Sequence, residues 1–477
     1  MNSHSTYESP LGTRYAGPSM RSLFSPRRRI LEWRRLWIAL ARAQRELGLP
    51  IDAAQIGQLE ERLEEIDFER AAMYEHKFRH DVMAHIHAFG DVAPEARGIL
   101  HLGATSCFVT DNADLVILRE ALDLLLSPLA STIDHLARFA RQHRALACVS
   151  YTHFQPAQLT TVGKRACLWI QDLSDDLRAL RALKDGLRFR GVKGTTGTQA
   201  SFLALFDGDH EKVRELDRSV AAALGFERCY GVTGQTYPRK LDFELLAGVA
   251  GVAISAAKMA GDLRLLAHER ELEEPFEQHQ IGSSAMAYKR NPMRSERICS
   301  LARFITAQVD CAAQTAMNQW LERTLDDSAA RRLILPESFL AADGLLQTLL
   351  NVSSGLVVHP TQIEQHVRRE LPFMATEEIL MAATRAGGDR QTLHESIRKH
   401  SLAAAERVKA GGDNDLLERI AADLDFAEIH DRLSDLTRPE RFVGRAPEQV
   451  DEFLAREIDP LLLEFKDRLG GRGDVWV

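Results

Sequence analysis

Five long stretches in the middle of the chain contain few helix-breaking residues and carry apolar side chains at three- and four-residue spacing. They cover residues 112–146, 161–190, 238–272, 292–318 and 336–358. That spacing is typical of α-helices, and helices of about 25–35 residues are well above the usual mean length. Such lengths suit a bundle of parallel rods, while strand signals are few. The sequence therefore predicts an all-α fold with a central bundle of long helices.

One of these stretches is apolar on almost every side. The side chains that cover much of its circumference are Leu245, Leu246, Val249, Val252 and Ile254. A helix of this kind is buried against more than one neighbour, which predicts association between subunits. The apolar run ends at Lys258, short of the ~20 residues that a membrane span needs, so a soluble protein without membrane partners is expected.

Charge and cysteine usage narrow the function classes. The net charge is −8 and the pI is near 6.1, which argues against a basic face for nucleic acid or membranes. A phosphate site would then be a local arginine cluster. The six cysteines form no C-x-x-C pair and no regular framework, and the first thirty residues lack the apolar run of a signal peptide. Reduced thiols and a cytoplasmic location are predicted.

A chain of 477 residues is expected to form two or three domains. Residues 1–105 are predicted to be an N-terminal helical domain, with an irregular arm over 1–25 that is rich in Ser, Gly, Pro and Arg. Residues 106–358 contain the long helices. His359-Pro360 marks a boundary, and 359–477 are predicted to be a C-terminal domain of shorter helices.

The segment from Gly282 to Arg297, G-S-S-A-M-A-Y-K-R-N-P-M-R-S-E-R, combines two serines with a cluster of cations. Asn291-Pro292 is typical of a helix start, with Asn as the cap and Pro in the first turn. Lys289 and Asn291 would then lie at a positive helix end that favours anions. The segment predicts chemistry beside a carboxylate, and the alternative is an ordinary polar loop before a helix.

This segment resembles the signature loop of the fumarase/aspartase superfamily, G-S-x-x-M-P-x-K-x-N, and its extension resembles the adenylosuccinate lyase family in the form typical of animals. The resemblance runs from about Arg14 to about residue 465. It implies a three-domain fold, a homotetramer with the long helices as its core, active sites shared between subunits, and no metal or organic cofactor. Ala287 stands where the superfamily usually has Pro, which predicts a less ordered loop that closes more slowly.

His153 precedes Gln155-Pro156, where the backbone is biased away from helix. Local evidence alone favours a structural histidine. However, the stretch T-H-F-Q-P-A-Q-L-T-T-V-G-K-R resembles the general-acid region of the family, which implies that His153 is the acid and that Ser283 is the base. Glu296 is a possible partner of the imidazolium.

Four histidines in a short run, His76, His80, His85 and His87, raise the alternative of a metal site. Acidic or Cys ligands do not recur at metal spacing, and H-E-x-x-H is absent. The better match is the family's R-H-D-V-M-A-H, which implies that Arg79, His80 and Asp81 line the substrate site.

Further matches imply a nucleotide site. Arg323, Ser328 and Arg332 match the residues that hold the 5′-phosphate, although in isolation they equally suit a solvated charged turn. The remaining matches to substrate-binding residues are Arg14, Tyr15, Thr105, Ser106, Gln235 and Arg297. The Gly-rich segment 191–201 lacks the G-K-[ST] ending of a P-loop, which favours a tight connection instead.

The resemblance implies β-elimination of fumarate from adenylosuccinate, and from the succinylaminoimidazole carboxamide ribotide of purine synthesis. Two alternatives remain. Argininosuccinate lyase, or another lyase of the superfamily, shares the serine loop but usually lacks the R-S-E-R extension and the Arg/Ser/Arg cluster. A catalytically idle structural protein on the same fold, like the lens crystallins, would not need His153, Ser283 and Lys289.

Overall fold

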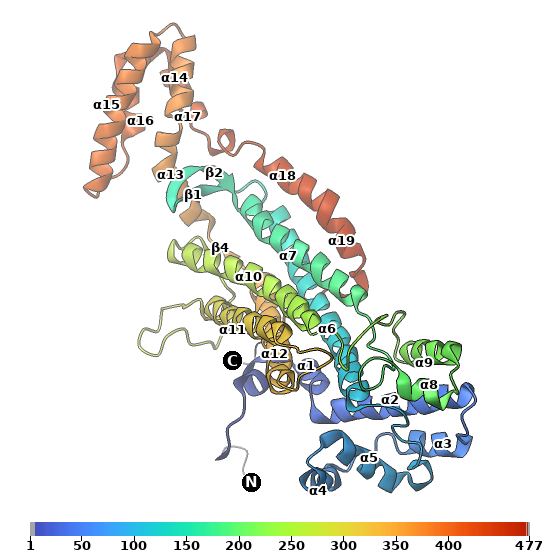
Figure 1. Cartoon of the computed structure of the whole chain (residues 1–477). Helices are drawn as coiled ribbons and strands as arrows, with labels where there is room; N and C mark the ends of the chain where they lie inside the picture. Colours follow the sequence, from blue (N-terminus) through green and yellow to red (C-terminus); the bar gives the residue numbers. More distant parts are fainter. Residues whose placement is uncertain (1–4, 474, 476–477) are drawn as a thin grey trace.

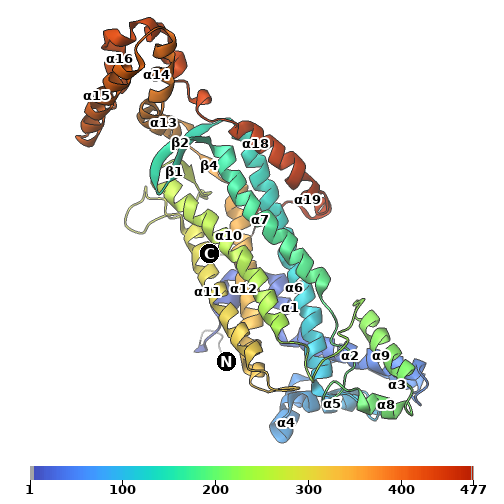
Figure 2. The ribbon, with the colours of Figure 1, turned by 45° about the horizontal axis from the view of Figure 1, so that its top comes forward.

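Five long helices run side by side as an elongated bundle (Figures 1 and 2). The computed structural model describes residues 5–473 and 475. The bundle consists of α6 (Ser106–Gln142), α7 (Val162–Gly186), α10 (Lys240–His268), α11 (Met293–Met317) and α12 (Asp327–Ser354). These helices confirm the all-α prediction. The predicted stretch that begins at 336 starts nine residues too late, since α12 begins at Asp327 and contains Pro336. Packing against α6, α10 and α11 outweighs the local preference of this proline.

Apolar side chains of α10 divide between the core and the surface. Leu245, Leu246 and Val249 are fully buried, whereas Ile254 is 58% and Leu265 46% exposed. By length and composition alone, α10 and α12 could cross a membrane, but half of the apolar window of α10 and 72% of that of α12 is buried inside the protein. Core helices often have this character, and the exposed side chains leave apolar surface on α10.

Shorter helices cover the end of the bundle where α6 begins (Figure 1). They are α2 (Pro26–Glu46), α3 (Ala53–Glu61), α4 (Phe68–Phe78), α5 (Asp81–Val92), α8 (Ala200–Leu205) and α9 (His210–Ala223). The side chain of Ser25 accepts the N–H of Arg28 (3.2 Å) and caps α2, as a Ser before Pro at a helix start predicts.

The N-terminal arm is more regular than predicted. A π-type turn, Leu11–Tyr15, and α1 (Pro18–Leu23) pack against α12. The N–H of Gly17 donates to Asp343 Oδ2 (2.6 Å), and the backbone of Tyr15 lies so close to Gly344 that a Cβ there would come within 2.9 Å. The prediction of an irregular arm was wrong for this part, because tertiary contacts with α12 order it. Residues 1–4 lie outside the described residues.

The C-terminal helices divide into two groups. The first, α13 (Pro360–Met374), α14 (Thr376–Arg385), α15 (Arg390–Lys409), α16 (Leu416–Ala422) and α17 (Leu433–Leu436), extends beyond the bundle (Figure 1), and from residue 375 it has a small core of its own. The second, α18 (Ala446–Phe453) and α19 (Asp459–Leu463), returns to the main core. The predicted division at 105/106 and 358/359 falls at the start of α6 and just before α13, and the three-domain assignment stays a prediction.

Two small antiparallel strand pairs complete the fold. Strands β1 (Ala147–Thr152) and β2 (Gln155–Thr161) form a hairpin between α6 and α7, and β3 (Leu272–Glu273) pairs with β4 (Val357–Val358). The β3–β4 pair places the chain that leads into the serine segment beside the chain that leads into α13.

Candidate active site

A cavity of about 1100 Å³ opens where α6 and α12 begin. It gathers nine of the residues predicted to bind substrate, from four separate stretches of the sequence. They are Arg79, His80, Asp81, Thr105, Ser106, Gln235, Arg323, Ser328 and Arg332. This size is in the range of small-molecule sites or slightly above it, so the cavity has room for a nucleotide.

The start of α6 supplies an anion site at this cavity. Thr105 is the N-cap residue, with its backbone extended, and Ser106 begins the helix. The Ser106 hydroxyl lies 3.3 Å from His80 Nε2, while His80 Nδ1 accepts the N–H of Met83 (3.3 Å). A positive helix end with two hydroxyls favours a carboxylate, as the predicted roles of Thr105 and Ser106 require.

The predicted phosphate cluster lines the same cavity. Ser328 and Arg332 are one turn apart on the same face of α12, and the Arg332 guanidinium donates to Asp81 (2.8 Å). Arg323 donates from Nη1 to Gln235 Oε1 (3.1 Å) and contacts the Cys107 thiol. All three residues line the cavity, but their exposure differs: the Arg323 side chain is 20% exposed and that of Arg332 56%. The alternative of a solvated charged turn therefore does not describe Arg323, and the phosphate role of the three residues stays a prediction.

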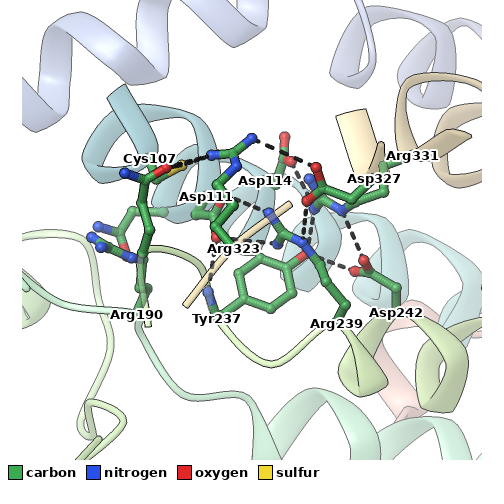
Figure 3. A network of polar contacts seen from close by, with 12 residues as sticks. Cys107, Asp111, Asp114, Arg190, Tyr237, Arg239, Asp242, Arg323, Asp327 and Arg331 are labelled. Atoms are coloured by element: carbon green, nitrogen blue, oxygen red, sulfur yellow. Dashed lines mark hydrogen bonds and ion pairs between the residues drawn. The ribbon is translucent and has the colours of Figure 1, made fainter. Parts of the chain in front are cut away.

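A buried ionic network (Figure 3) contributes Asp111, Arg239 and Asp327 to the lining of the cavity. Arg239 donates both terminal nitrogens to Asp111 (3.0 and 3.1 Å) and its Nε to Asp327 (2.7 Å). Although burial alone raises a carboxyl pKa, Arg239 and Arg331 hold the pKa of Asp111 below its usual value. Removing one partner of such a pair leaves a buried charge unpaired, at a cost of about 3–5 kcal/mol.

The sequence reasoning missed this network, although several of its members lie inside the motifs that it used. Asp327 and Arg331 belong to the Arg323–Arg332 cluster, and Arg239 ends the segment that begins at Thr233. The signal was an Asp and an Arg between functional residues. Only the fold shows their partners, because Asp327 pairs with Arg239 and Arg331 pairs with Asp242. Others also line the cavity without having been predicted: Cys107, Thr195 and Thr196. Burial raises the pKa of the Cys107 thiol to about 11, so it is protonated at neutral pH.

The Gly-rich segment 191–201 is a tight connection, as expected. Gly197 has φ +83°, and a Cβ there would lie 1.8 Å from the carbonyl oxygen of Thr233. Only glycine allows the two backbones to approach this closely. The close approach brings Thr195 to Gln235, whose Nε2 donates to the Thr195 carbonyl (3.0 Å).

Three of the four clustered histidines have separate environments. His80 faces Ser106, His85 packs edge-on between Trp33 and Phe68, and His87 stacks near Tyr74 and Phe78. Within the described part of the chain, no three His, Cys, Asp or Glu side chains are grouped as a metal site would need.

His153 lies at the tip of the β1–β2 hairpin. Thr152 pairs with Gln155, so His153 and Phe154 form a two-residue turn, with φ +52° and +58°. Asn-Gly is the usual pair in such a turn, because positive φ is unfavourable for bulky side chains. Both side chains are exposed. The backbone thus presents an imidazole to the surroundings at a conformational cost, which is typical of functional positions.

The segment from residue 275 to 292, here called the Ser loop, projects from the side of the bundle (Figure 1). Ser283 Oγ accepts the backbone N–H groups of Ala285 (3.3 Å) and Met286 (3.1 Å). Two such donors stabilise an alkoxide, which a serine needs in order to act as a base. Lys289 is exposed in the same loop.

The predicted helix cap was wrong. Helix α11 begins at Met293 with Pro292 as its N-cap residue, and Asn291 Nδ2 instead donates to the Gly282 carbonyl (2.7 Å). The first-turn N–H groups of Arg294 and Ser295 donate to the carboxylate of Glu274 (3.0 and 2.9 Å). This helix end is therefore already neutralised, so it does not provide the predicted anion site. Glu274 is about twenty positions away in sequence, where no local pattern points to a cap.

Arg14, Tyr15 and Arg297 form a third group. The Arg297 guanidinium lies 5.8 Å from the centre of the Tyr15 ring. Burial lowers the pKa of Arg297, and the neighbouring Arg14 lowers it further. Two arginines and a phenol side by side are suited to an anion. Glu296 pairs loosely with Arg264 (3.9 Å).

The predicted site residues form groups that are far apart within one chain. The 37 residues of α6 make it about 55 Å long, and it separates Ser106 at one end from the His153 hairpin at the other (Figure 2). Similarly, α11 has 25 residues and a length of about 37 Å, which separates the Ser loop from Arg323. One chain thus brings nine residues to the cavity and leaves His153, the Ser loop and the Arg297 group elsewhere.

Residue 287 is Ala where the superfamily pattern has Pro, and this difference leads to a prediction. The N–H of Lys289 donates to the Met286 carbonyl (3.0 Å), so Ala287 is the second residue of a turn, where Pro is favoured. We expect Ala287→Pro to stabilise the loop by about 0.4–1 kcal/mol and to slow hydrogen exchange over residues 281–290. KM should be unchanged or modestly lower. Faster exchange in the Pro variant, or a collapse of activity, would contradict this expectation.

His101 supports the segment that leads to Thr105 and gives a second prediction. It accepts the indole N–H of Trp37 (2.9 Å), and burial, with His80 nearby, lowers its pKa to about 4. Below pH 6.5 the unfolded chain binds a proton that the folded chain does not. Stability is therefore lost as the pH falls from about 6.5 towards 4, by about 1.4 kcal/mol per unit.

We expect His101→Asn to reduce the loss of unfolding free energy between pH 7 and pH 5 by about 1–2 kcal/mol. Asn tolerates the positive φ of this position, +62°, and its carbonyl can accept from Trp37. Denaturant unfolding at the two pH values measures the difference. If the variant loses as much unfolding free energy between pH 7 and pH 5 as the parent does, His101 is not the cause of that loss.

The comparisons with known proteins point to one family. Residues 20–307 match the family described as Lyase, and residues 372–453 match the family described as Adenylosuccinate lyase C-terminus. The adenylosuccinate lyase of Saccharomyces cerevisiae is 53% identical over 473 residues, 98% of each chain. That of Schistosoma mansoni is 47% identical over the full length of both.

Among solved structures, 3-carboxy-cis,cis-muconate lactonizing enzyme from Pseudomonas putida superposes with a TM-score of 0.80 at 22% identity, covering 96% of this chain and 99% of that one. A fumarate lyase from Mesorhizobium superposes with a TM-score of 0.79 at 23% identity. At these identities the likeness establishes the fold alone, whereas the full-length identities above establish kinship: this chain belongs to the adenylosuccinate lyase family.

Proposed function

We propose that this protein is a carbon–nitrogen lyase that eliminates fumarate from adenylosuccinate, giving AMP, and from the succinylaminoimidazole carboxamide ribotide. The observation that carries the proposal is the cavity, which is lined both by Arg323 and Arg332 and by the hydroxyls at the start of α6. These two groups suit the two ends of such a substrate, a phosphate and a succinyl carboxylate.

The chemistry needs a base, an acid and an anion site. The proton removed lies α to a carboxylate, so the carbanion needs electrostatic stabilisation, which the start of α6 and the cation of Lys289 can provide. Ser283, with its two N–H donors, takes the proton. His153 then protonates the leaving nitrogen as the C–N bond breaks. This route requires no metal or organic cofactor.

We further propose that the active protein is a homotetramer whose sites draw residues from different subunits. The length of α6 supports this, because His153 and Ser106 of one chain cannot meet across about 55 Å. The exposed Ile254 and Leu265 of α10 provide an apolar surface for association. The six free thiols suit the reducing cytoplasm, where we place the protein.

A steady-state assay that follows the loss of adenylosuccinate absorbance tests the function. Turnover of adenylosuccinate, with none of argininosuccinate, is expected. Turnover of argininosuccinate alone would favour the related lyase, and no turnover by a folded tetramer would favour a structural protein on this fold.

A further inference from the structure

The base of the Ser loop is held by two buried residues of opposite charge. Glu274 directly precedes the loop and is 8% exposed, and Arg294 lies just after it and is 5% exposed. We infer that these two residues form a clamp that closes the base of the loop and thereby positions Ser283. The inference rests on the role of Ser283 as the base under the proposed function.

The first half of the clamp runs from Glu274 to α11. One carboxylate oxygen accepts the N–H of Arg294 (3.0 Å), and the other accepts both the N–H and the hydroxyl of Ser295 (2.9 Å each). Ser295 is fully buried. A negative side chain that satisfies the first-turn N–H groups fixes a helix end, so the end of the Ser loop is tied to its beginning.

The second half runs in the opposite direction. The Arg294 guanidinium donates from Nη1 to the Pro275 carbonyl (2.7 Å) and from Nη2 to the carboxylate of Glu277 (2.7 Å) and to Gln280 Oε1 (3.3 Å). A planar fork with several donors holds three acceptors in one geometry. The first residues of the loop are thus bound by the first turn of the helix that follows it.

Rigid elements carry both halves, whereas the loop beyond them has little support of its own. Glu274 follows β3, which pairs with β4, and Arg294 belongs to α11. In contrast, the loop exposes Ile281 (78%) and Tyr288 (85%). The position of Ser283 therefore depends on the frame at the base and on the surface that the loop closes over. Since small misplacements are costly in catalysis, Glu274 and Arg294 are positioning residues rather than catalytic ones.

Two variants test the clamp in the full-length tetramer. Glu274→Gln keeps the size of the side chain but removes one of the two acceptor oxygens. Arg294→Lys keeps the charge and the backbone N–H but loses the fork. We expect each to lower kcat by about 10–100-fold with a smaller change in KM, because the nine predicted substrate-binding residues of the cavity lie at the other end of α11 and keep their contacts. Hydrogen exchange over residues 276–291 should become faster.

The matched control is Asp389→Asn. Asp389 caps α15 through the same pair of donors, the N–H and the hydroxyl of Thr392 (2.9 and 2.8 Å), but it lies in the C-terminal helices. The kcat of Asp389→Asn and the rate of hydrogen exchange in its Ser loop should equal those of the parent.

Three outcomes would overturn the inference: parent-like kcat in both clamp variants, faster loop exchange without a fall in kcat, or faster exchange spread evenly over the bundle. If Ser283→Ala itself retained full turnover, the proposed function of Ser283 would fail, while the exchange data would still decide whether the clamp orders the loop.

Discussion

Ser283→Ala and His153→Ala are each expected to lower kcat by several orders of magnitude while the protein stays folded. A positioned acid or base alone contributes about 10²–10⁴-fold, and alanine also removes the Oγ that the N–H groups of Ala285 and Met286 hold. His153 is exposed at a hairpin tip, so its loss leaves no cavity in the core. Steady-state kinetics on purified, sized protein measures both effects.

Ser284→Ala is the matched control for the loop. Ser284 is the exposed neighbour of Ser283, and no described hydrogen bond involves its hydroxyl, so we expect nearly parental turnover. Turnover close to that of the parent in Ser283→Ala or His153→Ala, with the tetramer intact, would refute the assignment of that residue.

Mixing the two inactive variants is expected to restore activity. If each site takes His153 from one subunit and Ser283 from another, random assembly of equal amounts leaves about a quarter of the sites with both groups, by the statistics of a symmetric oligomer. The distances along α6 and α11 are the physical reason to expect this. Activity is measured after subunit exchange by mild denaturation and renaturation.

Each variant treated alone in the same way is the control and should stay inactive. The exchange of subunits is verified by native mass spectrometry of subunits that differ in mass. If mixed tetramers form and no activity returns, His153 and Ser283 act from one chain, and the proposed sharing of sites between subunits is wrong.

Helical periodicity correctly predicted the long helices, because an α-helix depends on side chains three and four positions apart. The predicted residues followed from contiguous motifs, such as those around Arg323 and Gln235, and nine of them meet in one cavity. Local preferences also misled in places. The apolar spacing placed a helix start at residue 336, nine residues too late, and Asn291 suggested a cap that it does not form.

Tertiary structure alone decided three features. The carboxylate of Glu274 caps α11 from outside the helix, Arg239 joins Asp111 to Asp327 in the lining of the cavity, and Asp343 of α12 holds the arm through Gly17. Each contact joins residues that no sequence period relates. Their pairing follows from the burial of polar groups, which must find partners once the bundle excludes water, and which partner is in reach depends on how the long helices pack.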